Sequence, residues 1–434
     1  MFTNYHFDRT PIFLLAGSLL VLAACSSSNN SGSSPDDPPP ANGGNPPAAP
    51  AAVVVVAGDD EGGDIQNTIS WALDADATDY TVFWSNAPGV TENSSVLVPA
   101  FSGTRYATHS DGDVVAGNTY YYRVRAASAD GNSELSDEVA ATPQAAITNN
   151  ALNDVAWNGV DTLVAVGDSG VILTSPNATT DPWSDVSPAA APQQLTGVTW
   201  ESVNSQFLVV GAGNTVLTGD GVNWNLEDLD NLPGASNLQD VAFLGDKYIA
   251  VGNNATILTS NVDGSAWEAQ DAGPVPGATS FNAVAASDDR IVVVGSNGTV
   301  VTSVDAQNWE QQLPVGNNNL NDITWDGSRF TVVGSNDTVF TSPDGLTWTA
   351  HIPGTADINL VAVTQFDSGL PQNPFVAAVG SSGTMVIDPA AEPGTIVITG
   401  TTRMLSGMTW VDDGAGSAYA VIVGSDGTVL TAGY

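Results

Sequence analysis

The chain has 434 residues, of which 47 are acidic and only 8 are basic, so its formal net charge is −39. This surplus of negative charge repels phosphate backbones and excludes nucleic acid as a partner. Cys25 is the only cysteine, which excludes disulfides, thiol catalysis and cysteine-based metal sites in the rest of the chain.

Residues 1–24 have the pattern of a secretory signal. Arg9 is followed by an uncharged apolar run that is too short to span a bilayer, which takes about 20 residues. The run ends in "LAAC", which resembles the lipobox of bacterial lipoproteins. The resemblance implies cleavage before Cys25, lipidation of Cys25 and membrane contact through this lipid anchor alone. Ser26 resembles the residue found in lipoproteins sorted to the outer membrane of Gram-negative bacteria. The alternative is an ordinary secreted protein.

Residues 25–52 are rich in Ser, Asn, Gly, Pro and Ala and contain almost nothing that a core could bury. We predict that they form a disordered tether between the anchor and the folded part of the chain.

Residues 53–143 are expected to form a first domain of short strands separated by turns. Its last third, "VVAGNTYYYRVRAASADG", places Val114, Gly117 and Tyr120 at the offsets of the tyrosine corner. This pattern resembles the end of a fibronectin type III domain, although Val114 and Ala116 replace the usual Leu and Pro. The resemblance implies a β-sandwich that acts as a spacer or docking module.

Residues 144–434 contain seven copies of one unit with a period of about 42 residues. Each copy has an apolar first strand, a second strand that ends in Val-Gly, a tight turn and a third strand. A repeat of this length with four strands indicates a β-propeller, here with seven blades. The alternative, a solenoid, would need capping repeats that are not visible. The copies begin at Leu152, Leu195, Leu238, Phe281, Leu320, Ile358 and Leu405.

The stretch "TSPDGLTWT" lies between the third and fourth strands of the fifth copy and has relatives in the first four copies. It resembles the Asp-box, or BNR repeat, of sialidases and of many propellers that are not sialidases. In such a turn the aspartate, here Asp344, accepts backbone N–H groups, and Gly345 allows a positive φ. We therefore expect Asp344 to be structural and not catalytic.

The seventh copy has only three strands, so its third strand would leave an unpaired edge. We predict that residues 144–150, between the first domain and the first copy, supply the missing outer strand. The expected fold is thus all-β, a fibronectin type III-like sandwich followed by a seven-bladed propeller.

The propeller lacks a recognisable catalytic set. A sialidase grips its substrate with three arginines, but the copies contain only Arg290, Arg329 and Arg403, besides Lys247. The first two arginines and Lys247 precede second strands, on the face opposite the expected ligand site. The propeller also resembles photosystem II assembly factors, whose basic patch this chain lacks, so that function does not transfer.

The inner strands, if they start at the axis, place two rings of side chains at the mouth of the central channel. The third residues include Asp154, Asp240 and Asp322. The polar groups are either strand-end caps or a recognition or cation site, with Asn153, Asp154, Gln239, Asp240, Asn321 and Asp322 as candidates. The second residues are polar in every copy: Asn153, Thr196, Gln239, Asn282, Asn321, Asn359 and Ser406.

We therefore expect a monomeric cell-envelope lipoprotein that binds a protein or a glycan on its propeller face. The alternative is a hydrolase with an unrecognised pair of acids, which would lie about 5–10 Å apart. No cofactor is expected. The acidic loops are candidates for Ca²⁺.

Overall fold

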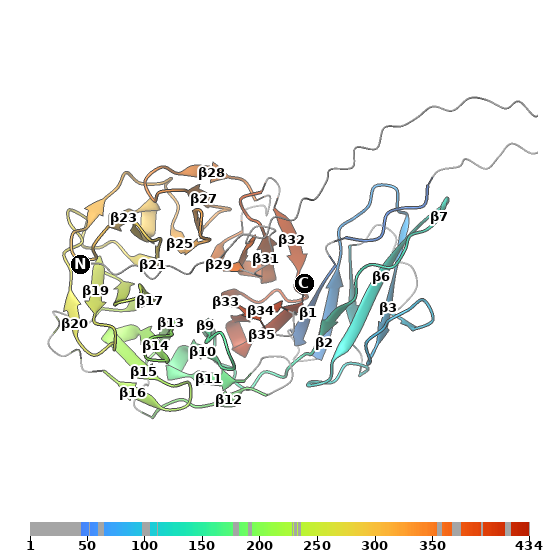
Figure 1. Ribbon diagram of the computed structural model, residues 1–434, viewed down its shortest axis with the longest axis horizontal. Coiled ribbons are helices and arrows are strands. Elements are labelled where there is room, and N and C mark those ends of the chain that lie inside the picture. Colours follow the sequence, from blue (N-terminus) through green and yellow to red (C-terminus); the bar gives the residue numbers. More distant parts are fainter. Residues whose placement is uncertain are drawn as a thin grey trace, which may run out of the picture. The chain divides into compact units, whose positions relative to one another are not determined.

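The computed structural model describes residues 45–433 apart from residues 52, 60–64, 98–104, 111, 177–181, 190–192, 228, 230–231, 233–235, 354–357, 367–374, 392–393 and 413–417. The predicted signal and Cys25 lie outside these residues, as does most of the predicted tether. The described part is all-β, with short 3-10 turns as its only helical elements (Figure 1). None of its helices is long and apolar enough to cross a membrane.

Seven four-stranded antiparallel units form a ring, which confirms the predicted β-propeller (Figure 1). Blade 1 consists of β9 (Leu152–Trp157), β10 (Leu163–Gly167), β11 (Ile172–Ser175) and β12 (Ser184–Asp185). Blade 2 consists of β13 (Leu195–Glu201), β14 (Gln206–Gly211), β15 (Thr215–Gly219) and β16 (Trp224–Leu226). Blade 3 consists of β17 (Leu238–Phe243), β18 (Tyr248–Gly252), β19 (Thr256–Ser260) and β20 (Trp267–Ala269).

Blades 4 to 6 repeat this arrangement. Blade 4 consists of β21 (Phe281–Ala286), β22 (Ile291–Gly295), β23 (Val300–Ser303) and β24 (Glu310–Gln311). Blade 5 consists of β25 (Leu320–Trp325), β26 (Phe330–Gly334), β27 (Val339–Ser342) and β28 (Thr349–His351). Blade 6 consists of β29 (Leu360–Phe366), β30 (Phe375–Gly380), β31 (Thr384–Ile387) and β32 (Thr395–Ile398).

The hydrophobic cores lie between neighbouring blades. Val164 and Val166 of β10 pack with Phe207 and Val209 of β14, for example, and the other interfaces follow the same pattern. Second strands are therefore buried on both faces, which explains why they appear in the sequence as unbroken apolar runs ending in glycine.

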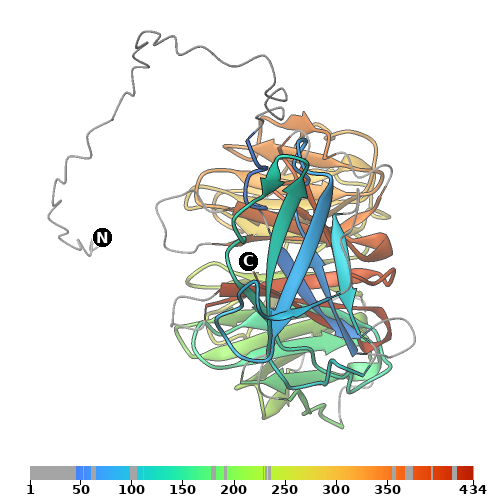
Figure 2. The same ribbon diagram turned by 90° about the vertical axis from the view of Figure 1, so that its right-hand side faces the viewer.

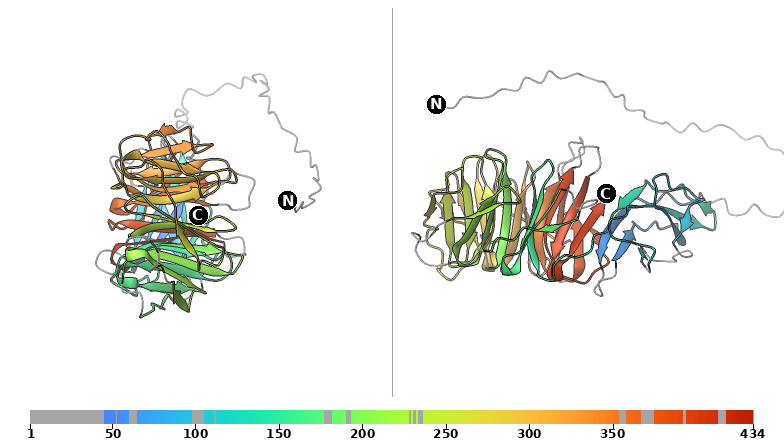
Figure 3. Two further views of the ribbon diagram at one scale, coloured as in Figure 1. Left: turned by 90° about the vertical axis from the view of Figure 1, so that its left-hand side faces the viewer. Right: turned by 90° about the horizontal axis from the view of Figure 1, so that it is seen from below.

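The seventh blade closes with a strand from the beginning of the folded chain. Its first three strands are β33 (Leu405–Asp412), β34 (Ala418–Gly424) and β35 (Val429–Gly433). The outer strand is β1 (Val54–Asp59), in which Val56 pairs with Ala432 and Ala57 with Thr431. Figure 3 shows the blue N-terminal strands beside the red strands of the last blade. The prediction that residues 144–150 supply this strand is wrong. They contain no strand, and the Thr148 carbonyl instead lies against the turn at Gly427.

Strand β1 also pairs with β2 (Ile65–Ser70), which in turn pairs with β5 (Tyr106–His109), so one sheet of six strands runs from β33 to β5. The remaining strands form a second sheet (Figure 2). These are β3 (Asp79–Ser85), β4 (Ser95–Val96), β6 (Tyr120–Ser128), β7 (Gly131–Asn132) and β8 (Val139–Ala141).

The side chains of β1 alternate between two cores. Val55 and Ala57 pack with Tyr80 and Tyr122 of the second sheet. Val54 and Val56 pack into the core between blades 6 and 7. A strand buried on both faces has no polar side, which accounts for the run "VVVVA" in the sequence.

Tight turns join the second and third strands. Each has a central residue with positive φ, as in Asn297 at 55°. Backbone bonds tie these turns to the next blade, such as Gly298 N to Asn318 O at 2.7 Å. Five of the turns are 3-10 turns: η1 (Asp168–Gly170), η2 (Ala212–Asn214), η3 (Ser296–Gly298), η4 (Ser381–Gly383) and η5 (Ser425–Gly427).

The aspartate turns, which join third and fourth strands and contain Asp220, Asp263, Asp305 and Asp344, have the predicted hydrogen bonds. Asp344 Oδ1 accepts the backbone N–H groups of Leu346 and Thr347 at 2.9 and 2.8 Å. Gly345 has a φ of 71°, and a Cβ at this position would lie 2.6 Å from Cγ2 of Val292 in the preceding blade. Asp344 is therefore a structural residue, as predicted.

The sixth repeat begins two residues later than predicted. Leu360, and not Ile358, pairs with the glycine that ends the second strand, as Leu320 does in the fifth repeat. The second residue of this inner strand is consequently Val361. Asn359 lies before the strand, where its side chain accepts the Asn336 N–H at 3.1 Å.

Candidate functional site

The inner strand of every blade carries a β-bulge at its second residue, at the channel mouth. In β17, for example, Leu238 pairs with Gly252 and Asp240 with Val251, while Gln239 is skipped. A bulge leaves the extra residue outside the ladder. The residues in this position are Asn153, Thr196, Gln239, Asn282, Asn321, Val361 and Ser406.

Four of these bulge residues bond to the next blade around the ring. Each donates from its side chain to the carbonyl of the leucine that begins the next inner strand. The bonds are Asn153 to Leu195 at 2.7 Å, Thr196 to Leu238 at 2.8 Å, Asn282 to Leu320 at 2.7 Å and Asn321 to Leu360 at 2.7 Å.

The other three bulge residues differ. Gln239 has no side-chain hydrogen bond to any described residue, and the Ser406 hydroxyl is buried without a partner among them. The expectation that all seven side chains are polar is wrong, because Val361 takes the place expected for Asn359. Gln239 is therefore the bulge residue whose side-chain amide lies at the channel without a hydrogen bond to any described residue.

The three aspartates form a second set of links between blades. Asp154 Oδ1 accepts the N–H of Val155, and its Oδ2 accepts that of Val198 in blade 2, both at 2.8 Å. Asp240 bonds in the same way to Val241 and to Val284 of blade 4, and Asp322 to Ile323 and to Val363 of blade 6.

Small residues alternate with these aspartates around the ring. A Cβ on Gly197 would lie 3.2 Å from Asp240 Cα, and one on Gly407 would lie 2.7 Å from Asp154 Cα. A large side chain does not fit at either place. The carboxylates therefore link blades 1 to 2, 3 to 4 and 5 to 6.

Enclosure within the ring raises the pKa of these carboxyl groups. Loss of solvation raises the pKa of Asp154 to about 7 and that of Asp240 to about 6, and the pKa of Asp322 well above its usual value. Bonds from backbone N–H groups oppose the shift, while repulsion from Asp240 adds to it at Asp154 and Asp322. At a pH between the usual pKa of aspartate and these raised values, the three carboxyl groups therefore stay protonated in the folded chain, whereas they would be ionised in the unfolded chain.

A cavity of about 260 Å³ opens at the channel mouth, and all seven blades contribute to it. All six predicted site residues line it, although most of their polar atoms bond to neighbouring blades. Sequence reasoning missed Gln194 and Met404, which precede the inner strands. Their position could have identified them, because each directly precedes the apolar residue that begins a copy of the repeat. The six predicted residues that line the cavity are Asn153, Asp154, Gln239, Asp240, Asn321 and Asp322.

Within the described part of the chain, no group of three or more His, Cys, Asp and Glu residues is placed to hold a metal ion. The three aspartates instead direct their oxygens at backbone N–H groups.

Comparison with known proteins supports the propeller. Residues 183–351 match the DUF6242 beta propeller domain. No curated protein matches the chain. Among solved structures, the chain is similar to YCF48 bound to a D1 peptide, at 15% identity over 66% of this chain and 92% of that one, with a TM-score of 0.53.

Two further structures resemble the chain. YCF48 from Cyanidioschyzon merolae has 14% identity over 66% of this chain and 96% of its own, with a TM-score of 0.52. The WD40 propeller of Doa1 has 12% identity over 66% and 93%, with a TM-score of 0.50. Identities this low establish a shared fold only.

Proposed function

We propose that the protein is a non-catalytic interaction module that binds a protein or glycan at the channel mouth. The observation that carries this proposal is the cavity to which all seven blades contribute, with the uncommitted amide of Gln239 at its wall. Amide groups both donate and accept, so they suit peptide backbones and sugar hydroxyls alike. YCF48 bound to a D1 peptide shows that a propeller of similar fold can hold a peptide, although the fold alone does not identify the ligand of this chain.

A hydrolytic alternative has its best candidates in Asp154 and Asp240, because raised pKa values are typical of catalytic acids. Their geometry favours the structural role. Both oxygens of each carboxyl group accept a backbone N–H, so a substrate would have to break a bond between blades to reach them.

We further propose a cellular setting. Residues 1–24 are the signal peptide, Cys25 carries the lipid, and residues 25–52 tether a monomer to the outer membrane of a Gram-negative bacterium. The partner is then an envelope or extracellular protein or glycan. The net charge of −39 disfavours direct adhesion to anionic lipid and is consistent with contact through the anchor alone.

Residues 53–143 are proposed to be a fibronectin type III-like domain, followed by the propeller at 144–434, which also includes strand β1 of the first domain. Support comes from Tyr120, whose hydroxyl donates to the Asp113 carbonyl at 2.9 Å and accepts the Val115 N–H at 2.9 Å. This is the bonding expected of a tyrosine corner. The aspartate turns likewise support the proposed BNR repeat. We also propose that the acidic loops bind Ca²⁺.

The test is to fill the cavity. Peptide and glycan arrays probed with the full mature chain should give binding that Gln239→Trp abolishes. Leu313→Trp, at a side chain that is 88% exposed and outside the cavity, is the control and should bind normally. Equal binding by both variants, at equal melting temperature, would place the ligand elsewhere.

A further inference from the structure

The hairpins between first and second strands carry a cation in three consecutive blades. Lys247, Arg290 and Arg329 occupy the same position, directly before β18, β22 and β26. In blade 5 the hairpin supplies its own counter-ion. Buried Asp326 accepts the Arg329 backbone N–H at 2.8 Å and pairs with its guanidinium Nε at 3.2 Å.

In blades 3 and 4 this internal acid is missing, because Leu244 and Ser287 stand where blade 5 has Asp326. The Arg290 guanidinium makes no ion pair or hydrogen bond with any described residue. Lys247 reaches Asp246 at 3.9 Å, and the Asp246 side chain is 76% exposed. An exposed pair at this distance contributes little. Two cations are thus left without strong partners in a chain that has 47 acidic residues.

Both cations line one cavity of about 550 Å³ between the hairpins of blades 3 and 4. Phe243 and Trp325 give it aromatic surface. Four aspartates, Asp246, Asp288, Asp289 and Asp305, also line this cavity, and Asp288 and Asp289 are exposed at its wall. The cavity therefore combines cations, aromatic rings and acceptors of hydrogen bonds.

A second cavity, of about 480 Å³, continues from the first, since Lys247 and Ala306 line both. Its wall is polar and includes Asn261, Gln270 and Gln307, together with the carboxylate of Glu268. The two cavities provide more room than a single small anion needs.

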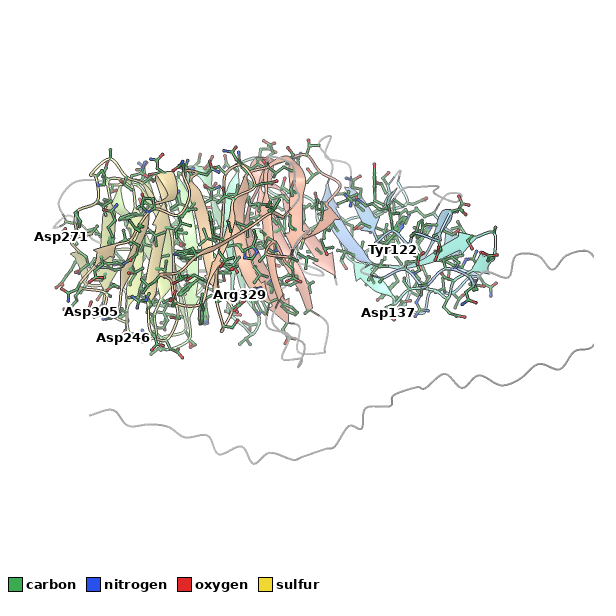
Figure 4. The ribbon with its side chains drawn as sticks, turned by 90° about the horizontal axis from the view of Figure 1, so that it is seen from above. Tyr122, Asp137, Asp246, Asp271, Asp305 and Arg329 are labelled. Carbon is green, nitrogen blue, oxygen red and sulfur yellow. The ribbon has the colours of Figure 1, made fainter. Side chains whose placement is uncertain are left out.

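These cavities lie at the opposite end of the inner strands from the channel mouth. Strand β17 begins at the mouth with Leu238 and ends beside the Asp246 hairpin. In Figure 4, Asp246 and Asp305 of this region lie toward the same edge of the ring. The site is therefore distinct from the one proposed above.

We propose that this pair of cavities binds an acidic saccharide. One carboxylate of the sugar pairs with Arg290 and Lys247. Its hydroxyls donate to Asp288 and Asp289, and its C–H face packs on Trp325. A phosphate-rich or strongly acidic polymer fits less well, because the neighbouring aspartates would repel any charge beyond the first. A neutral sugar would leave the cations unpaired.

The test measures calorimetric affinity of the full mature chain for a disaccharide of glucuronic acid and glucose, in about 0.15 M salt, where the Debye length is about 8 Å. Arg290→Gln and Lys247→Gln should each weaken binding about tenfold, as loss of one charge-assisted bond implies. Arg329→Gln is the matched control, since this arginine is already paired within its own hairpin, and it should bind normally.

Three ligand controls complete the experiment. The neutral disaccharide cellobiose, acetate and an acidic hexapeptide should all bind at least tenfold more weakly than the uronate. The proposal is overturned if Arg290→Gln and Lys247→Gln, shown to be folded by their melting temperatures, bind as tightly as the parent chain. It is equally overturned if acetate or the hexapeptide matches the uronate, or if Arg329→Gln loses as much affinity as Arg290→Gln. Gln239→Trp should leave this binding intact.

Discussion

Each aspartate at the channel mouth joins two blades at an electrostatic cost. Asp240 gains two backbone hydrogen bonds, at 2.7 and 2.8 Å, but loses solvation inside the ring. The residues of this site were predictable because they repeat at fixed places in the copies. Their role was not, since the bonds run between blades and depend on a bulge that periodicity does not reveal. Asn359 was misplaced because both Ile358 and Leu360 fit the start of an apolar strand.

The raised pKa values predict a pH dependence of stability. The folded chain holds a proton on Asp240 up to a pH of about 6, whereas the unfolded chain releases it near 3.8. Ionisation of Asp240 therefore lowers the stability of the folded state as pH rises from about 4 to 7. In Asp240→Asn this contribution is absent.

We expect the melting temperature of the parent chain, relative to that of Asp240→Asn, to fall as pH rises from about 4.5 to 7.5. His109, whose pKa is lowered by burial, acts in the opposite direction but is common to both proteins. Thermal melts of both chains across this range measure the difference. Parallel pH profiles would show that Asp240 is already ionised at low pH.

The aspartate turns give a second prediction at this scale. Asp344→Ala removes two hydrogen bonds to backbone N–H groups and should lower the free energy of unfolding by about 1–2 kcal/mol, with ligand binding unchanged. Asp130→Ala, at an exposed aspartate without a described side-chain bond and outside the described cavities, is the control for charge and should change stability by less than about 0.5 kcal/mol. Urea denaturation measures both values. A loss of binding at unchanged stability would instead make Asp344 a functional residue.

At the scale of elements, the repeat made most of the propeller predictable. Alternating apolar patterns locate first strands, and unbroken apolar runs before Val-Gly locate second strands. The origin of the closing strand was not predictable from local pattern, because β1 pairs with a strand more than 370 residues away in sequence. The expectation that an edge would be covered was right in principle. The run "VVVVA" was a usable signal, since a strand apolar on both faces needs two cores.

Strand β1 should therefore be as important to the propeller as any strand of the repeats. Val56 is 1% exposed and packs between blades 6 and 7. Val56→Asp would bury an unpaired charge there and should lower the free energy of unfolding by about 3–5 kcal/mol. Ala51→Asp, an exposed position just before the strand, is the control. Equal stability of the two variants in urea would mean that β1 does not close the ring.

At the scale of the whole molecule, the shared strand determines how the two parts of the chain unfold. Separate domains joined by a linker usually unfold independently. Here the six-stranded sheet from β33 to β5 passes without interruption from the seventh blade into the N-terminal strands. Val55 and Ala57 lie in one core, while Val54 and Val56 lie in the other. If either core melts, β1 loses half of its burial and the ring loses its outer strand.

We therefore expect residues 45–434 to unfold in one cooperative transition, with the calorimetric and van't Hoff enthalpies equal. Val55→Ala and Val56→Ala, which weaken opposite cores, should lower the same transition by similar amounts, about 2 kcal/mol each, because both remove the same buried methyl groups from one strand. Scanning calorimetry of the parent chain and both variants checks this. Two transitions, with each variant shifting only one of them, would show that the cores are independent despite the common sheet. In that case β1 could leave the propeller while the N-terminal sheets stay folded, and closure of the ring would be a reversible equilibrium.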